Sequence, residues 1–168
     1  LETVLEATRF WSTRVAHDPD GSYHLRYICG PDELHKPVDD NAYMNQSIRN
    51  LMRQAEDAIT KLHEIDRWSV ESLLARLGID KEERAGWADV AEKMYVPMLS
   101  ERVMEQFEGH SRLPISSPVA VKADGMGADQ IGKQADTVLL SQIIPWMFTR
   151  EEMLANYRHY APLCNQTS

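Results

Sequence analysis

The sequence lacks any long apolar stretch. Although 43% of its 168 residues are hydrophobic, no segment approaches the ~20 consecutive apolar residues that a membrane-spanning helix needs. The N-terminus also lacks the basic and then apolar segment that directs secretion. The chain begins at Leu1 without Met, so that second absence holds only for the residues given. The composition is that of a soluble globular domain, and no membrane partner is expected.

Cysteines and basic residues are few. Cys29 and Cys164 are the only cysteines, and they do not form the closely spaced pair typical of a metal site. Two free thiols in a reducing cytoplasm is the simplest interpretation, with a disulfide left as the alternative. Lys and Arg number 18 against 26 Asp and Glu, a net charge of −8. This acidic balance repels a phosphate backbone, so nucleic acid is not expected as a partner.

Apolar residues recur at helical spacing through the N-terminal half of the chain. Four helices are predicted there, over residues 2–15, 42–65, 69–78 and 80–96. Phe10 and Trp11 are expected on the buried side of the first. Ser69 is expected to be the N-cap of the third, and Asp80 with Glu83 forms a capping-box pattern that opens the fourth.

The segments around these helices carry turn and strand signals. A turn is predicted at Asp18-Pro19-Asp20-Gly21, followed by a short strand from Tyr23 to Ile28. Residues 97–128 are rich in proline and glycine and predict irregular structure, with a short strand from Val103 to Phe107.

The C-terminal part is again helical in pattern. Residues 129–148 are strongly apolar and predict a buried helix that bends near Pro145. Thr149 and Glu152 form a second capping-box pattern, which opens a last helix to about Tyr160. The predicted fold class is therefore all-α, mainly helical with a few short strands in loops.

Polar residues that favour chemistry gather in the loop from Gly30 to Asn41. A carboxyl group held beside other carboxylates in a proline-flanked loop has its pKa raised by like charge and partial burial. A general acid for a glycosidic oxygen needs a raised pKa, because it must stay protonated near neutral pH. A solvated acidic loop is the plainer alternative, and composition alone favours it. A metal site in this loop is a third interpretation, although the spacing of the acidic residues in the loop matches no calcium-binding loop.

A second polar group, Lys133, Gln134 and Asp136, stands at the start of the C-terminal apolar run. Lys and Gln side chains can donate hydrogen bonds to sugar hydroxyls. The alternative is that Lys133 is an ordinary surface residue and Asp136 an acid that favours the start of a helix.

Several segments together resemble glycoside hydrolase family 65, which contains maltose, trehalose, kojibiose and nigerose phosphorylases. The loop sequences Gly30-Pro31-Asp32-Glu33-Leu34-His35 and Val38-Asp39-Asp40-Asn41-Ala42-Tyr43-Met44-Asn45 follow the family pattern closely. Further matches occur in family order, at Arg9-Phe10-Trp11-Ser12-Thr13-Arg14-Val15, Ala91-Glu92-Lys93-Met94-Tyr95-Val96-Pro97, Glu105-Gln106-Phe107-Glu108-Gly109, Lys133-Gln134-Ala135-Asp136 and Asn156-Tyr157-x-x-Tyr160-x-Pro162. The matches span most of the chain.

The resemblance implies an inverting α-glucoside phosphorylase in which Glu33 is the general acid. Inorganic phosphate would be the nucleophile and co-substrate, so neither a cofactor nor a metal is implied, nor a second catalytic carboxylate. Lys133 and Gln134 match the pair that contacts sugar in the family. His35 and Asn41 lie in the acid loop and are expected to shape the acceptor side.

The resemblance also places the phosphate site at the C-terminus, with Gln166 and Ser168 as its candidates. Gln166 stands where the family has His, and an uncharged amide is a poorer anion ligand. This departure leaves an inverting α-glucosidase as an alternative, which would need a carboxylate base about 6.5–9.5 Å from the acid.

The family's central domain is an (α/α)6 barrel more than twice as long as this chain. Residues 1–168 are therefore expected to form part of such a barrel, as a fragment of a longer polypeptide that forms a homodimer. A non-catalytic helical fragment that only binds sugar or a protein stays open as a third function.

Overall fold

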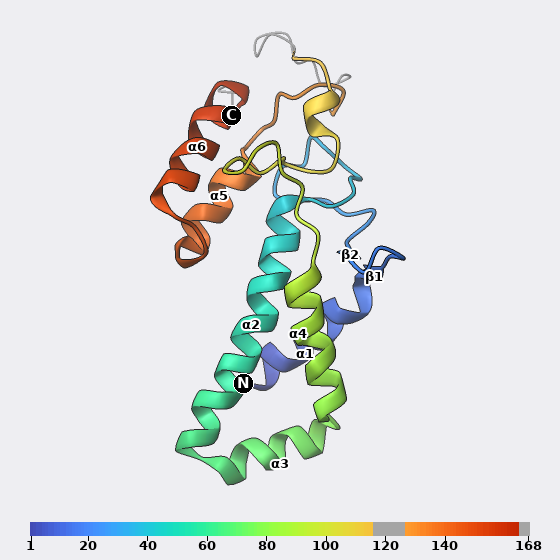
Figure 1. The fold of residues 1–168 in the computed structure, drawn as a ribbon, viewed down its shortest axis with the longest axis vertical. Helices are drawn as coiled ribbons and strands as arrows, with labels where there is room; N and C mark the ends of the chain where they lie inside the picture. Colours follow the sequence, from blue (N-terminus) through green and yellow to red (C-terminus); the bar gives the residue numbers. More distant parts are fainter. Residues whose placement is uncertain (116–126, 165–168) are drawn as a thin grey trace. The chain divides into compact units, whose positions relative to one another are not determined.

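The computed structural model describes residues 1–115 and 127–164. Its elements in chain order are α1 (Glu2–Arg14), β1 (Ala16–His17), β2 (Tyr23–His24), α2 (Ala42–Ile65), α3 (Arg67–Leu77), α4 (Lys81–Lys93), η1 (His110–Arg112), α5 (Asp136–Ile143), η3 (Pro145–Met147), α6 (Arg150–Tyr160) and η4 (Ala161–Leu163) (Figure 1). They form two compact units. Unit 1 consists of residues 1–24 and 47–94, and unit 2 consists of residues 25–46 and 95–168.

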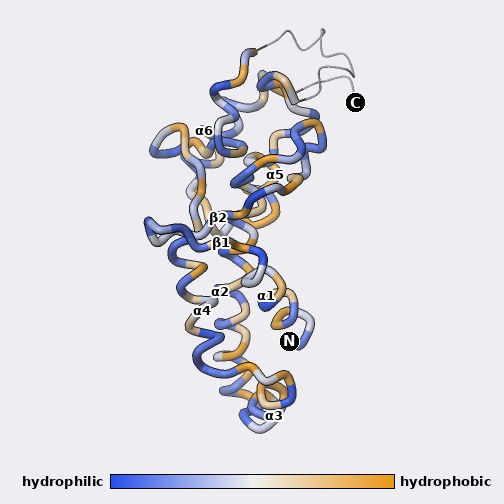
Figure 2. Tube along the Cα trace, turned by 90° about the vertical axis from the view of Figure 1, so that its right-hand side faces the viewer, coloured by the Kyte–Doolittle hydropathy of each residue, from blue (hydrophilic) through white to orange (hydrophobic). Residues whose placement is uncertain are grey.

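Unit 1 is a helical layer built on the amphipathic part of α2. Figure 1 shows α2 and α4 running alongside each other, with α3 joining their ends. The buried side chains of α2 recur at the helical spacing that places them on one face: Ile48, Met52, Ala55 and Ile59. Blue and orange segments alternate along both helices in Figure 2, as expected where only one face is buried. The predicted bounds of this long helix are confirmed.

The predicted buried side of α1 is wrong at Phe10, while Trp11 is half-buried. Its buried residues are Leu5 and Thr8, whereas Phe10 is 53% exposed. Arg9 explains the orientation, because its guanidinium bonds to the Glu83 carboxylate at 2.7 and 2.9 Å and to the Leu77 carbonyl oxygen at 3.0 Å. These contacts turn the Leu5 side of α1 inward.

Capping is predicted correctly at one helix start of unit 1 and wrongly at another. Asp66, not Ser69, caps α3, because the Asp66 carboxylate accepts a hydrogen bond from the Ser69 amide at 3.1 Å. Asp80 caps α4 as expected, at 2.8 Å from the Glu83 amide, but the predicted capping box is only half formed, because the Glu83 carboxylate bonds to Arg9. The α4 helix ends at Lys93, short of the predicted Val96.

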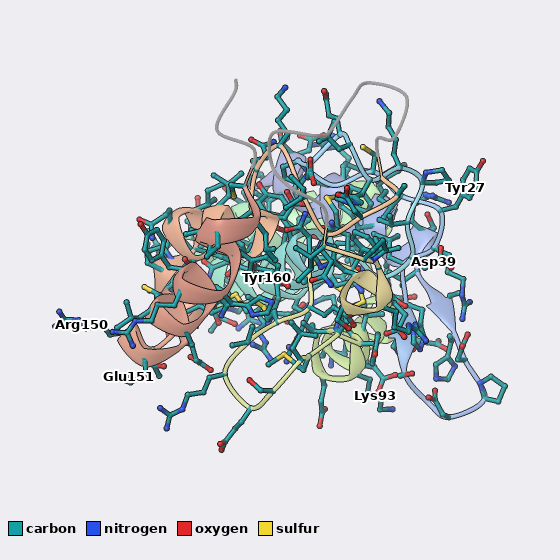
Figure 3. All side chains as sticks on the ribbon, turned by 90° about the horizontal axis from the view of Figure 1, so that it is seen from above. Tyr27, Asp39, Lys93, Arg150, Glu151 and Tyr160 are labelled. Atoms are coloured by element: carbon teal, nitrogen blue, oxygen red, sulfur yellow. The ribbon has the colours of Figure 1, made fainter. Side chains whose placement is uncertain are left out.

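Unit 2 has its core around α5 and α6. One buried cluster contains Ala42, Met104, Leu140 and Ile144, and a second contains Ile131, Tyr160 and Leu163. In Figure 3, the side chains of Arg150 and Glu151 at the start of α6 point outward. Tyr160, at the end of α6, lies among packed side chains. The Tyr160 hydroxyl donates to the Met104 carbonyl oxygen at 2.7 Å, which ties α6 to the chain before η1. The Thr149 and Glu152 capping box is confirmed.

The predicted helix over residues 129–148 is only partly present. The α5 helix begins at Asp136 and ends at Ile143, and η3 begins at Pro145. Before α5, the Asp129 carboxylate accepts from the Ile131 amide at 2.8 Å, and the Gly132 amide donates to the Leu163 carbonyl oxygen at 3.0 Å. These bonds use the Ile131 and Gly132 amides, which a helical ladder over this segment would need.

Strands are minor in the described residues. β1 and β2 are two residues each and pair in antiparallel register. The predicted strand from Val103 to Phe107 is absent, since only an isolated bridge joins Met98 to Met104. None of the helices in the described part of the chain is apolar over a length that would cross a bilayer.

Candidate active site

The loop from Gly30 to Asn41 is closed at its base by backbone hydrogen bonds. Ile28 and Val38 exchange two of them, at 2.9 and 2.8 Å between nitrogen and oxygen. One step further out, the Asp40 amide donates to the Leu25 carbonyl oxygen at 2.8 Å, and the Leu25 amide donates to the Asp40 carboxylate at 3.0 Å. The loop, which we call the acid loop, therefore has a fixed neck within unit 2.

Asp32 is the buried centre of the acid loop. Only 1% of it is exposed. Its Oδ2 accepts from Gln106 Nε2 at 3.1 Å and lies 2.7 Å from His35 Nδ1, and its Oδ1 accepts from the Lys133 amide at 3.1 Å. These donors come from three separate segments, so the Asp32 carboxylate joins the acid loop to the chain at Gln106 and Lys133. Gly132 permits the approach, because a Cβ there would lie 2.5 Å from Asp32 Oδ2.

His35 is buried beside Asp32, and its hydrogen bonds define its protonation. Its Nε2 lies 2.7 Å from the Asp129 carbonyl oxygen, which can only accept. Its Nδ1 faces the Asp32 carboxylate, so both ring nitrogens donate and the ring is an imidazolium. Burial lowers the pKa of His35, but the hydrogen bonds to Asp32 and Asp129 outweigh burial and leave this pKa raised.

Asp136, the first residue of α5, holds the loop from another side. It is fully buried, and it accepts from the Asp32 amide at 2.8 Å and from Asn41 Nδ2 at 2.9 Å. Burial raises the pKa of Asp136 to about 6, with the Asn41 hydrogen bond opposing the rise. Gly30 packs against this pair, since a Cβ there would lie 2.4 Å from both Asn41 Nδ2 and Asp136 Oδ2.

Lys133 and Gln134 lie next to the acid loop. The Gln134 amide donates to the Pro31 carbonyl oxygen, and the Lys133 side chain is exposed while its backbone bonds to Asp32. The structure therefore brings together all four residues that the sequence predicts as substrate contacts: His35, Asn41, Lys133 and Gln134. His35 and Asn41 are buried and bonded to carboxylates, which gives both a role in holding the loop.

Glu33 is exposed in the middle of this framework. The residues on both sides of it are anchored, through Pro31 and Asp32 before it and His35 after it. None of the described residues hydrogen-bonds its own carboxylate. The partial burial predicted for this carboxyl is not found, because the loop turns Asp32 inward and Glu33 outward. An exposed, rigidly carried carboxyl group is available to a ligand.

Several partners in this network were missed by sequence reasoning. Gln106, Asp129 and the structural role of Asp136 had no local signal, because each acts on a loop far away in sequence. Gln166 and Ser168, the predicted phosphate ligands, lie outside the described residues. Within residues 1–115 and 127–164, no group of three or more His, Cys, Asp or Glu side chains is arranged to hold a metal ion.

Residues 1–168 match the family model described as "Glycosyl hydrolase family 65 central catalytic domain". The chain belongs to glycosyl hydrolase family 65. The family prediction made from the acid loop and its companion motifs is confirmed.

Curated family 65 relatives are similar over almost the whole chain. The kojibiose phosphorylase of Caldanaerobacter subterraneus subsp. tengcongensis is 29% identical over 95% of this chain and 22% of its own length. The 1,2-alpha-glucosylglycerol phosphorylase of Bacillus selenitireducens is 27% identical over 96% and 23%. The alpha,alpha-trehalose phosphorylase of Thermoanaerobacter brockii is 26% identical over 99% and 23%. The chain thus spans less than a quarter of these relatives.

A solved structure, described as a putative kojibiose phosphorylase from human microbiome, superimposes with a TM-score of 0.84. The match covers 99% of this chain and 24% of the solved chain, at 22% sequence identity. At that identity the likeness concerns the fold. It confirms the all-α class and the prediction that a family 65 chain of this kind forms part of an (α/α)6 barrel.

Proposed function

We propose that the chain is part of the catalytic domain of an inverting α-glucoside phosphorylase, with Glu33 as its general acid. The observation that carries this proposal is the exposed Glu33 carboxyl in a loop whose neighbouring residues are anchored in a buried network. Positioning of this kind supports proton transfer, because a general acid must be held within hydrogen-bond reach of the atom it protonates.

The proposed reaction needs one acid and one nucleophile. The Glu33 carboxyl gives its proton to the glycosidic oxygen as the bond from that oxygen to the anomeric carbon breaks. An oxygen of inorganic phosphate attacks the anomeric carbon from the opposite face and inverts it. The products are β-glucose 1-phosphate and the free acceptor sugar. The names of the three relatives above, all phosphorylases, support phosphate as the nucleophile.

The remaining sequence predictions belong to this proposal. We assign Lys133 and Gln134 to the sugar side of Glu33, since both lie against the acid loop. His35 and Asn41 act on the acceptor side through the loop they hold. Gln166 and Ser168 stay the candidates for phosphate, no cofactor is required, and the homodimer stays a prediction. Cys29 and Cys164 are both free, which suits the predicted reducing cytoplasm.

The nucleophile is tested by product analysis. The longest natural form of the polypeptide that contains these residues would be incubated with kojibiose, trehalose, maltose and nigerose, with and without phosphate. Glucose 1-phosphate formed only with phosphate is the expected result. Free glucose at the same rate in both conditions would replace this proposal with the inverting α-glucosidase that Gln166 suggests. No product from any of them would favour the non-catalytic alternative.

The acid is tested by Glu33→Gln. We expect kcat on the disaccharide to fall by roughly 10²- to 10⁴-fold, the contribution of a positioned general acid. Glu101→Gln is the matched control, because Glu101 is an exposed glutamate of the same unit outside the acid loop. Activity retained in the Glu33 variant would remove this residue from the mechanism.

A further inference from the structure

The Asp136 carboxylate bonds to both ends of the acid loop. Its Oδ1 receives the Asp32 amide at 2.8 Å, next to Glu33, and its Oδ2 receives Asn41 Nδ2 at 2.9 Å, at the end of the loop. We propose that Asp136 is a positioning residue for the general acid: it holds the loop so that Glu33 meets the glycosidic oxygen. This inference rests on the proposed role of Glu33.

The direction of the hydrogen bond between Asn41 and Asp136 is fixed by a second contact. Asn41 precedes α2, and its Oδ1 accepts from the Met44 amide at 3.1 Å, so the side chain caps that helix. The Asn41 Nδ2 must then point to Asp136. A rotation of the Asn41 amide would turn Nδ2 toward Met44 and remove the cap. Asn41 therefore links the start of α2 to the start of α5 in one orientation only.

Position 136 requires a group that accepts at both of its atoms. Both contacts of Asp136 come from N–H donors, and a carboxylate provides two acceptors where an amide provides one. The start of α5 suits this anion, because its N-cap residue Ala135 makes no side-chain cap hydrogen bond and the helix N-terminus favours negative charge. The other charged groups that face Asp136 are Asp32 and the His35 imidazolium.

Asp136 positions Glu33 through its contact with Asp32. The Asp32 amide lies one residue before Glu33, and Gly30 packs directly against the pair formed by Asn41 and Asp136. Neither Asp136 nor its two bonded atoms is exposed to a ligand, since Asp32 and Asn41 are buried as well. Asp136 thus acts through Asp32 and does not touch the substrate.

The test reverses the donor and the acceptor. In Asp136→Asn, the new amide nitrogen faces a donor, either the Asp32 amide or Asn41 Nδ2. In Asn41→Asp, two carboxylates face each other. In the double variant, the Asp136→Asn amide donates to the Asn41→Asp carboxylate and still accepts from the Asp32 amide, while the new carboxylate accepts from the Met44 amide. All three hydrogen bonds are restored.

We expect each single variant to lower kcat on the disaccharide by roughly 10- to 100-fold, the loss that a displacement of about 1 Å causes. The KM values for sugar and phosphate should change little. The double variant should recover to within about 3-fold of the natural protein. Asp80→Asn is the matched control, because it is the same substitution at the start of α4 in unit 1. It should leave kcat unchanged.

A second substrate separates positioning from a folding defect. With α-glucosyl fluoride and phosphate, phosphate attacks the anomeric carbon and fluoride leaves without a proton, so the position of the acid matters little. Asp136→Asn should keep most of its rate on this substrate. Equal losses on both substrates, or a double variant no better than the single ones, would overturn the inference.

A failure of the proposed function can be distinguished from a failure of this inference. If Glu33→Gln keeps its activity on the disaccharide, the acid itself is misassigned. If Glu33→Gln is inactive while Asp136→Asn has normal kcat, the acid stands and only the positioning role of Asp136 is lost.

Discussion

His110 is the most unusual single residue of unit 2 outside the acid loop. It is buried among aromatic rings, with ring centroids 5.0 Å from Phe107, 5.5 Å from His35 and 5.9 Å from Tyr160. Neither of its ring nitrogens has a partner in good hydrogen-bond geometry within the described residues, although the Gln130 backbone lies near enough to oppose the lowering of its pKa. Burial, and then the charge of His35, lower the pKa of His110 to about 4. The ring is therefore neutral in the folded protein at neutral pH.

This burial makes the fold sensitive to acid. The folded pKa of His110 lies below its unfolded value, so the stability it contributes is complete above about pH 6.5 and is lost as pH falls through 4. The shift corresponds to about 3 kcal/mol. We expect His110→Phe, which keeps a ring at this position, to remove the part of the pH dependence of the free energy of unfolding that is due to His110. Urea unfolding at pH 7.5 and 4.5 measures it. The free energy of unfolding should fall less in the variant, and an equal fall in both proteins would contradict the argument.

At the same scale, the sequence predicts which loop carries the chemistry but not which side chain points inward. Asp32 and Glu33 are adjacent acids in one proline-flanked loop, and nothing local distinguishes them. The structure buries Asp32 because donors from Gln106, His35 and the Lys133 backbone converge on it. Two of these three lie far away in sequence. The sequence likewise places His35 and Asn41 on the acceptor side without indicating that both are buried, since their partners Asp32 and Asp136 are brought to them only in the folded chain.

The helix ends show how backbone conformation limits sequence at the scale of an element. Gly78 ends α3 with φ of 65° and ψ of 28°, and its amide donates to the Ala75 carbonyl oxygen at 3.1 Å. A Cβ there would meet nothing within 4 Å. Left-handed conformation, rather than space, is therefore the reason for glycine at this position. Gly86, inside α4, also has open space around it but has helical backbone.

The two glycines give a paired prediction of opposite sign. Gly78→Ala should destabilise unit 1 by about 1 kcal/mol, because alanine disfavours the left-handed conformation. Gly86→Ala should stabilise it by roughly 0.5–1 kcal/mol, because glycine inside a helix has the larger entropy loss on folding. Thermal unfolding followed by circular dichroism compares the two variants. A change of the same sign in both would show that the capping conformation at Gly78 is not the controlling factor.

The sequence predicts the bounds of a helix correctly only where contacts between nearby residues determine those bounds. The bounds of α2 and the capping box of α6 were predicted, because periodicity and capping act within a few residues. The apolar run from 129 was predicted as helix and is not helical before Asp136. Gly132 bonds to Leu163 and the Lys133 amide bonds to Asp32, and neither partner is visible in a local window.

At the scale of the whole molecule, the all-α class followed from periodicity, whereas the barrel did not. No pattern within the chain indicates how many helical pairs close a barrel, and this expectation came from the resemblance to family 65. Sequence does fix the net charge of −8, and the pI of about 5.2 follows from it. This charge opposes association of the chains at neutral pH, because like-charged molecules repel one another.

Exposed apolar side chains oppose that repulsion. In unit 1, Ile65 is 80% exposed and Trp68 is 77% exposed. Ile65 lines a groove of about 250 Å³ together with Leu1, Leu62, Asp66, Ser69, Val70 and Leu73. Exposed apolar side chains promote association once charge repulsion is removed.

The 168-residue chain should therefore be least soluble near pH 5.2 and should associate there at concentrations that leave it dispersed at pH 8. The double variant Ile65→Ser and Trp68→Ser removes the two most exposed large apolar side chains of unit 1 without changing the net charge. We expect it to stay dispersed closer to pH 5.2 than the natural sequence. Ala85→Ser, an exposed position on α4, is the neutral control. Light scattering across pH 8 to 5 gives the comparison, and identical curves for the double variant and the control would mean that this surface does not drive association.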